Sequence, residues 1–130
     1  PSVNLDTNES EYNNEDDVTN LKKIRDKNPN RPIIGQLNIN SIRNKFHSLK
    51  SLVCGNLDIL MLSETKVDDT FPTSQFMIDG FSKPYRLDRC SNGGGILIYV
   101  RNDINSRLIT KSKVSDKIEC LFIEIILRKK

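Results

Sequence analysis

Polar side chains that could bind a cation or a phosphate follow two apolar segments of the chain. Asn38 and Asn40 end a segment of β-type residues over 32–40, and Glu64 follows the apolar segment 57–62. Mg²⁺ binds through few carboxylates and keeps several waters, so one Glu helped by amide oxygens is enough when the substrate is itself a phosphate. A lone Asn or Glu at a strand end is also typical of turns and solvated surface. The residue types alone leave both interpretations open.

The elements that must position these residues form a strand, a helix and a second strand. Between the two apolar segments, residues 41–55 carry apolar side chains at i, i+4, i+7 and i+11, which is the period of one helix face. Ser41 is the predicted N-cap of this helix and Gly55 its predicted end. A βαβ unit of this kind has a right-handed crossover and parallel strands. Both strands then end at the same edge of the sheet, where we expect Asn38, Asn40 and Glu64 to converge.

The second part of the chain is rich in loops and strands. Residues 67–92 are punctuated by Pro and Gly, with a short strand predicted at 76–78. Further strands are predicted at 96–100, 107–110 and 117–127 from their β-branched and apolar residues. These strands could pair antiparallel on the same sheet. The sequence therefore predicts an α/β fold with a mixed sheet.

Two further features lack the context that a functional role would require. Gly93, Gly94 and Gly95 lack a following Lys-Ser/Thr and lead into a strand, so they predict a tight turn with close backbone approach rather than a phosphate loop. His47, the single histidine, lies among basic residues on the polar side of the predicted helix. We interpret it as a solvated surface residue.

Composition limits the class of protein. The chain has 130 residues, 36% of them hydrophobic, and a formal charge of +3. It contains no run of ~18 apolar residues that could span a membrane, and its three cysteines show no C-x-x-C spacing. Seven of the 17 acids but only four of the 20 bases fall in residues 1–30. We predict a disordered acidic, Asn-rich tail and linker over 1–31 and a mildly basic domain over 32–130.

The two polar strand ends match known motifs. Residues 37–45 (LNINSIRNK) and 58–66 (DILMLSETK) are similar to the first two motifs of the endonuclease/exonuclease/phosphatase superfamily. The residues that follow resemble, in order, the apurinic-endonuclease-like domain of LINE-type (non-LTR) retrotransposons, and the likeness extends over 33–127. These later residues are Asp68, Phe71-Pro72, Gly80-Phe81, Tyr85-Arg86, Asp88-Arg89, Gly93-Gly94-Gly95 and Tyr99-Val100-Arg101.

This resemblance implies the first half of a four-layer αββα sandwich and Mg²⁺- or Mn²⁺-dependent cleavage of DNA. Glu64 would bind the cation, Asn38 would contact the scissile phosphate or a water on the cation, and Asn40 would be a weaker cation ligand. The candidates for contacts to the DNA backbone are Arg43, Lys45, Lys66 and Arg101. The implied partners are DNA, the C-terminal half of the domain and a downstream reverse transcriptase, with an intracellular, nuclear location.

The chain departs from the family pattern after the first half of the domain. The family's Asp/Asn pair and its Asp-His couple belong to the second half, and His47 lies too early to replace that imidazole. We therefore expect the chain alone to be a poor or inactive catalyst, with one sheet face exposed. Two alternatives stay open: a phosphatase of the same superfamily acting on a small or lipid phosphate ester, and a catalytically dead fragment that acts as a binding module.

Overall fold

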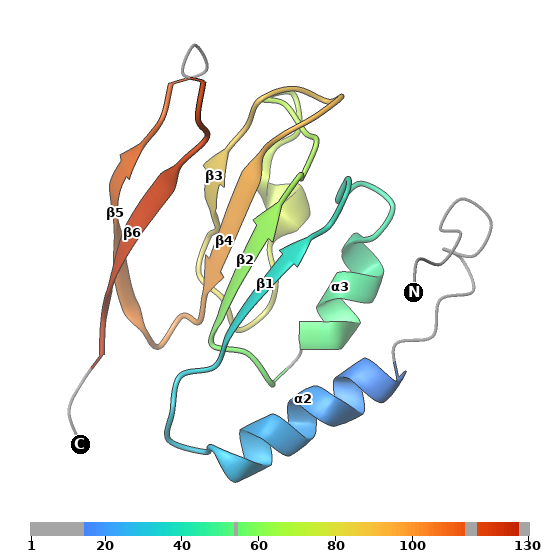
Figure 1. Ribbon diagram of the computed structural model, residues 1–130, viewed down its shortest axis with the longest axis vertical. Coiled ribbons are helices and arrows are strands. Elements are labelled where there is room, and N and C mark those ends of the chain that lie inside the picture. The colour runs from blue at the N-terminus through green and yellow to red at the C-terminus, as the bar shows by residue number, and fades with distance from the viewer. Residues whose placement is uncertain (1–14, 54, 114–116, 128–130) are drawn as a thin grey trace.

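The computed structural model describes residues 15–53, 55–113 and 117–127, and these form two sheets flanked on one side by helices (Figure 1). The four-stranded sheet has the order β1-β2-β4-β3, with bounds Ile34–Asn38, Ile59–Ser63, Ile96–Val100 and Tyr85–Leu87 for β1, β2, β4 and β3. Strands β1 and β2 are parallel and the other pairs antiparallel. The predicted α/β class with a mixed sheet is confirmed.

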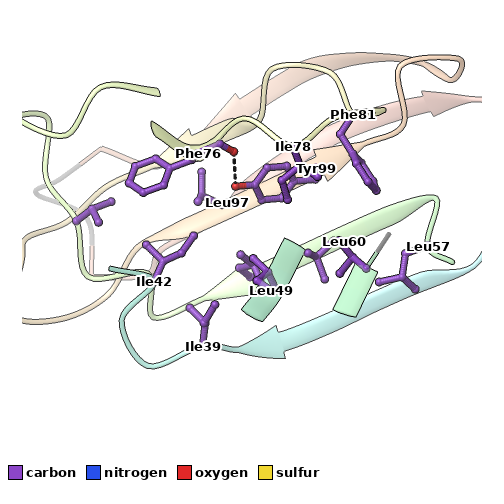
Figure 2. Packing of buried hydrophobic residues seen from close by; sticks show 13 residues of the cluster. Ile39, Ile42, Leu49, Leu57, Leu60, Phe76, Ile78, Phe81, Leu97 and Tyr99 are labelled. Atoms are coloured by element: carbon purple, nitrogen blue, oxygen red, sulfur yellow. Dashed lines mark hydrogen bonds between the residues drawn. The ribbon is translucent and has the colours of Figure 1, made fainter. Parts of the chain in front are cut away.

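The two faces of this sheet follow from the alternation of side chains along each strand. Leu60, Leu62, Leu97 and Tyr99 point to the face covered by α3 (Phe46–Val53) and the 3₁₀ turn η2 (Thr73–Phe76). Figure 2 shows this core, in which the Tyr99 hydroxyl donates a 2.8 Å hydrogen bond to the carbonyl of Phe76. Burial of the apolar side chains of β2 and β4 removes them from water, and each contributes roughly 1.5–3 kcal/mol to the free energy of unfolding.

The opposite face of the sheet carries the second layer. Strands β5 (Asn105–Lys111) and β6 (Leu121–Ile126) form a separate antiparallel pair. Leu121, Ile123 and Ile125 of β6 pack on Ile59, Ile98 and Val100 of the large sheet. The order helix, sheet, sheet is that of a partial α/β sandwich. The expectation that the later strands could all join one sheet is thus wrong for β5 and β6, because their apolar face covers the sheet instead of extending it.

Several predicted boundaries differ in the structure. The helix begins at Phe46 and not after Ser41. An N-cap residue normally has an extended backbone, whereas Ser41 has φ 78°, so Ser41 does not cap the helix. The strand predicted at 76–78 is absent; Phe76 ends η2 instead and packs in the core. β3 was not predicted, since three residues carry little pattern. It forms because its backbone pairs with that of β4.

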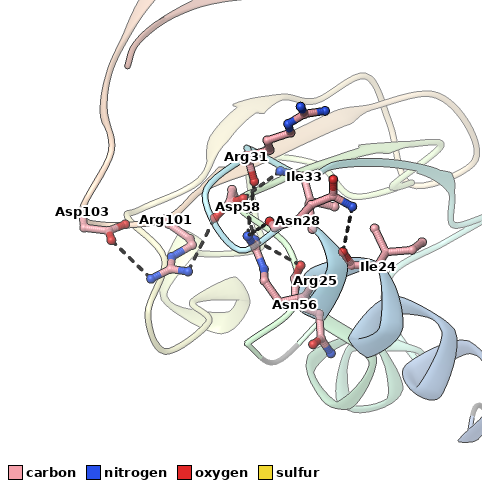
Figure 3. A network of polar contacts seen from close by, with 9 residues as sticks. All are labelled: Ile24, Arg25, Asn28, Arg31, Ile33, Asn56, Asp58, Arg101 and Asp103. Atoms are coloured by element: carbon pink, nitrogen blue, oxygen red, sulfur yellow. Dashed lines mark hydrogen bonds and ion pairs between the residues drawn. The ribbon is translucent and has the colours of Figure 1, made fainter. Parts of the chain in front are cut away.

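The N-terminal segment is the largest correction. The prediction of a disordered tail and linker over 1–31 is wrong for Glu15–Lys27, which forms helix α2; residues 1–14 lie outside the described part of the chain. Leu21 packs against the main core, and Arg25 donates a 2.6 Å hydrogen bond to the Asp58 carboxylate (Figure 3). Composition could not reveal these contacts, because their partners lie far along the chain. No described helix has the length and apolar character needed to cross a membrane.

Candidate active site

The parallel register brings the two polar strand ends together. Asn38 is paired with Ser63, so the residue after each strand emerges at the same rim of the sheet. The contact continues beyond the ladder: the Ile39 amide donates to the Ser63 carbonyl at 3.0 Å, and the Ser41 amide to the Glu64 carbonyl at 2.8 Å. The predicted convergence of Asn38, Asn40 and Glu64 therefore holds for their backbones.

The backbone at this rim is held in an uncommon conformation. Asn40, Ser41, Glu64 and Lys66 have φ values of 47°, 78°, 56° and 56°. Each non-glycine residue in this region costs roughly 1–2 kcal/mol. Hydrogen bonds between neighbouring segments maintain the conformation, including Lys66 N–H to the Gly94 carbonyl at 2.9 Å. Strain of this kind persists only where the surroundings over-determine it, and it gathers at functional sites.

The Glu64 carboxylate has one fixed oxygen and one free oxygen. Its Oε2 accepts a 2.7 Å hydrogen bond from the Gly94 amide. Within the described ranges, Oε1 has no hydrogen-bond partner and the carboxylate forms no ion pair. The residue is half-buried, so solvent only partly compensates its charge. A half-buried carboxylate that is oriented and lacks a cation is chemically suited to bind a divalent metal ion.

Asn38 has one end of its amide engaged and the other free. Its Oδ1 accepts a 3.1 Å hydrogen bond from the Asn40 backbone N–H, which fixes the orientation of the amide. The side chain is exposed. Its Nδ2 has no partner among the residues that the structure describes. This group is available to donate a hydrogen bond, and its contact to a phosphate stays a prediction.

Asn40 does not fit the predicted role of a cation ligand. Its Oδ1 accepts a 2.6 Å hydrogen bond from the Lys66 ammonium, and its carbonyl accepts one of 2.8 Å from Lys45. A divalent ion on the same amide oxygen would be repelled by the lysine that already binds it. Asn40 instead holds Lys66 at the rim.

Three of the four residues that we predicted to contact the DNA backbone lie at this rim. Lys66 and Lys45 bind Asn40 as described, and Arg43 reaches across to donate to the Ser91 carbonyl at 3.2 Å. Arg101 is at the other end of the sheet, because β4 runs antiparallel to β2 and Val100 pairs with Ile59. There it forms ion pairs with Asp58 and Asp103 (Figure 3). The structure does not bring Arg101 to the rim, about 13 Å away along β2.

The glycine segment has the predicted tight turn and close approach. Gly94 and Gly95 have φ values of 71° and 102°, and a Cβ on Gly95 would overlap the Thr65 hydroxyl. Sequence reasoning missed that this turn binds Glu64, and that the Gly95 amide also donates to Glu119 at 3.1 Å. No local signal marks Glu119, because only the fold brings it next to the turn.

The remaining acidic side chains do not complete a metal cluster. Among the described residues, no three His, Cys, Asp or Glu side chains gather so that they could hold a metal ion. Asp68, which follows β2, accepts hydrogen bonds from the Thr70 hydroxyl and amide, which hold the pKa of its carboxyl below the usual value. His47 is exposed on α3, as predicted. A cation at this rim would depend on Glu64 alone, with water and substrate as its other ligands.

Comparison with known proteins adds no relative at this point. No protein-family model matches the chain, and no curated protein matches it in sequence.

Proposed function

We propose that this chain carries part of a Mg²⁺-dependent phosphodiesterase site that acts on DNA, in the manner of a retrotransposon endonuclease. The observation that supports the proposal is the pairing of an oriented carboxylate with a free oxygen, on Glu64, and an amide with a free N–H, on Asn38, at one rim of the sheet. Ligands of α/β sheets bind at the carboxyl ends of the strands, where these two groups lie.

The residues at the rim divide the chemical work. Glu64 would hold Mg²⁺ or Mn²⁺, which supplies Lewis-acid stabilisation of the charge that develops on the phosphate oxygens. Asn38 would donate to a phosphate oxygen and orient the ester. Lys45, Lys66 and Arg43 place positive charge around the same rim. Such contacts to the nucleic-acid backbone fix its position without reading its sequence.

Cation binding by Glu64 is the first test. Mn²⁺ serves as the probe, because its free form is measured directly by electron paramagnetic resonance. Glu64→Gln keeps the size of the side chain and removes its charge, so we expect the affinity for Mn²⁺ to fall by at least about tenfold. Glu124→Gln is the matched control, since Glu124 lies on β6 and pairs with Arg107 away from the rim. Equal affinity of wild type and Glu64→Gln would remove Glu64 from the site.

DNA cleavage and binding form the second test. Nicking of supercoiled plasmid in Mg²⁺ should be weak in wild type and lost in Glu64→Gln; equal nicking by both would contradict the mechanism. Affinity for a labelled duplex should fall as salt rises, and Lys66→Gln should reduce the slope by about one counterion. Hydrolysis of a phosphomonoester without nicking would instead support the phosphatase alternative. DNA binding with neither reaction would support a binding module.

A further inference from the structure

The amides of Gly94 and Gly95 each bind a carboxylate from a different part of the chain. The Gly94 N–H donates to Oε2 of Glu64 at 2.7 Å, and the Gly95 N–H donates to Oε1 of Glu119 at 3.1 Å and to Oε2 at 3.3 Å. Glu64 follows β2 of the large sheet, whereas Glu119 precedes β6 of the second sheet. The two carboxylates are thus linked through two consecutive peptide groups that meet at the Cα of Gly94.

Glu119 is held in place from both sides. The β5–β6 hairpin is closed beside it by two hydrogen bonds, Ser112 N–H to the Cys120 carbonyl at 2.9 Å and Cys120 N–H to the Ser112 hydroxyl at 3.1 Å. Arg89 forms an ion pair with the Glu119 carboxylate at 3.7 Å, and the Glu119 side chain is 28% exposed. These contacts fix its oxygens against the glycine turn.

The turn is shaped to receive these side chains. A Cβ on Gly94 would overlap Oε2 of Glu119 and would lie 2.6 Å from Nε of Arg89. Glu119 and Arg89 therefore occupy the space in which any other residue at position 94 would place its side chain. Glycine has access to more backbone conformations than any other residue, so the orientation of the Gly94 amide depends on the contacts that hold the turn.

We propose that Glu119 is a positioning residue for Glu64. By accepting from the Gly95 amide, Glu119 fixes the turn in the orientation that aims the Gly94 amide at Oε2 of Glu64 and leaves Oε1 free. This inference rests on the proposed cation-binding role of Glu64. Residues that orient a metal ligand from behind it typically contribute 10–100-fold to metal affinity. Because Glu119 acts through one further peptide unit, we expect an effect at the lower end of this range.

Three substitutions at position 119 distinguish loss of the hydrogen bond to the Gly95 amide from a general loss of stability. Glu119→Ala removes the acceptor and should lower Mn²⁺ affinity by about tenfold. Glu119→Gln keeps an acceptor oxygen for the Gly95 amide and should stay within about threefold of wild type. Glu119→Asp withdraws the carboxylate by one methylene and should lie between the two; it provides the same test if the alanine variant does not fold. Glu124→Ala, on the same hairpin, should leave the affinity unchanged.

A second measurement follows the turn itself, without metal. Amide hydrogen exchange by NMR can resolve Gly94 and Gly95, since the chain contains six glycines. In Glu119→Ala the exchange of both amides should accelerate by at least about tenfold, whereas Gly35, which lies in β1, should be unaffected. A general loss of stability would accelerate all three amides together. Selective acceleration at the turn marks the loss of its local restraint.

The outcomes distinguish this inference from the proposed function. If Glu64→Gln leaves Mn²⁺ affinity unchanged, the proposed cation site fails and the inference fails with it. If Glu64→Gln weakens binding but Glu119→Ala or Glu119→Asp binds Mn²⁺ as wild type does, the cation site stands and the positioning role is overturned. Weakened binding with equal acceleration at Gly35, Gly94 and Gly95 would also overturn it, because the effect would then be one of global stability.

Discussion

The two ends of β2 carry carboxylates with opposite surroundings. Asp58, just before the strand, is buried and accepts from Arg25 at 2.6 Å and from the Ile33 amide at 2.7 Å, with Arg101 at 3.5 Å. Glu64, just after the strand, accepts from a single amide and keeps one free oxygen within the described residues. Both oxygens of the Asp58 carboxylate are engaged within the protein, whereas the Glu64 carboxylate has one oxygen available for a ligand.

Backbone strain separates the same two ends. In the described part of the chain, all four non-glycine residues with positive φ lie at the Glu64 end: Asn40, Ser41, Glu64 and Lys66. At the Asp58 end, the chain changes direction at Gly80, where positive φ has little cost. Unstrained non-glycine backbone and a carboxylate paired with Arg25 and Arg101 characterise the end that stabilises the fold. Strain and an incompletely paired carboxylate characterise the end to which we assign chemistry.

Removing Asp58 should give the largest loss of stability. Asp58→Ala leaves the half-buried Arg25 guanidinium without its counter-charge, and breaking a pair whose carboxylate is buried costs up to about 3–5 kcal/mol. Urea denaturation followed by circular dichroism measures the change. Asp103→Ala is the control, because Asp103 is exposed and its pair with Arg101 is worth less than about 1 kcal/mol. A loss below about 1 kcal/mol for Asp58→Ala would show that the ion pairs of Asp58 contribute little to the stability of this end of the sheet.

The substitutions Gly95→Ala and Gly80→Ala compare the stability of the two ends of the sheet directly. Gly95 and Gly80 have φ values of 102° and 88°, so both substitutions impose similar backbone strain, about 1–2 kcal/mol. A Cβ on Gly95 overlaps Thr65, whereas a Cβ on Gly80 meets nothing within 4 Å. Overpacking adds about 1–3 kcal/mol at Gly95 only. Thermal or urea unfolding of both variants tests this, and equal losses would mean that the turn beside Glu64 can relax.

Tyr99 should make a smaller contribution to stability, and this contribution should be lost at alkaline pH. It is fully buried near the Asp58 end, opposite Leu60, and burial raises the pKa of its hydroxyl, with Arg86 opposing the shift. The unfolded chain loses this proton near pH 10, so stability is retained below that pH and falls above it by up to about 1.4 kcal/mol per pH unit.

Tyr99→Phe isolates this contribution. At neutral pH it should cost about 1 kcal/mol, because the Phe76 carbonyl loses its donor. Above pH 10 the difference between the two proteins should shrink, since the variant lacks the ionising group. Urea midpoints measured from pH 8 upward report the difference, and a constant gap across this range would contradict the assigned pKa direction.

Much of the fold was accessible from periodicity. The strand-helix-strand order predicted the parallel β1–β2 pair and the rim at which Asn38 and Glu64 meet. Helix α2 was missed because its stability derives from Leu21 and Arg25, whose partners lie elsewhere in the chain. The strand pattern alone did not place β5 and β6 in a second layer, because apolar residues in a strand do not specify which surface they cover, whereas the family resemblance implied a sandwich of two sheets.

The sequence by itself determined which residue types stand at the strand ends, because apolar periodicity and polar termini are properties of consecutive residues. Only the tertiary structure decided what each polar group does. In the folded chain the Asn40 amide oxygen accepts a hydrogen bond from Lys66, and Arg101 lies at the other end of the sheet from the rim. Glu119 lies next to the glycine turn that binds Glu64. The physical reason is that hydrogen bonds and charge pairs act over a few ångströms in space, and folding alone sets which distant residues come within that range.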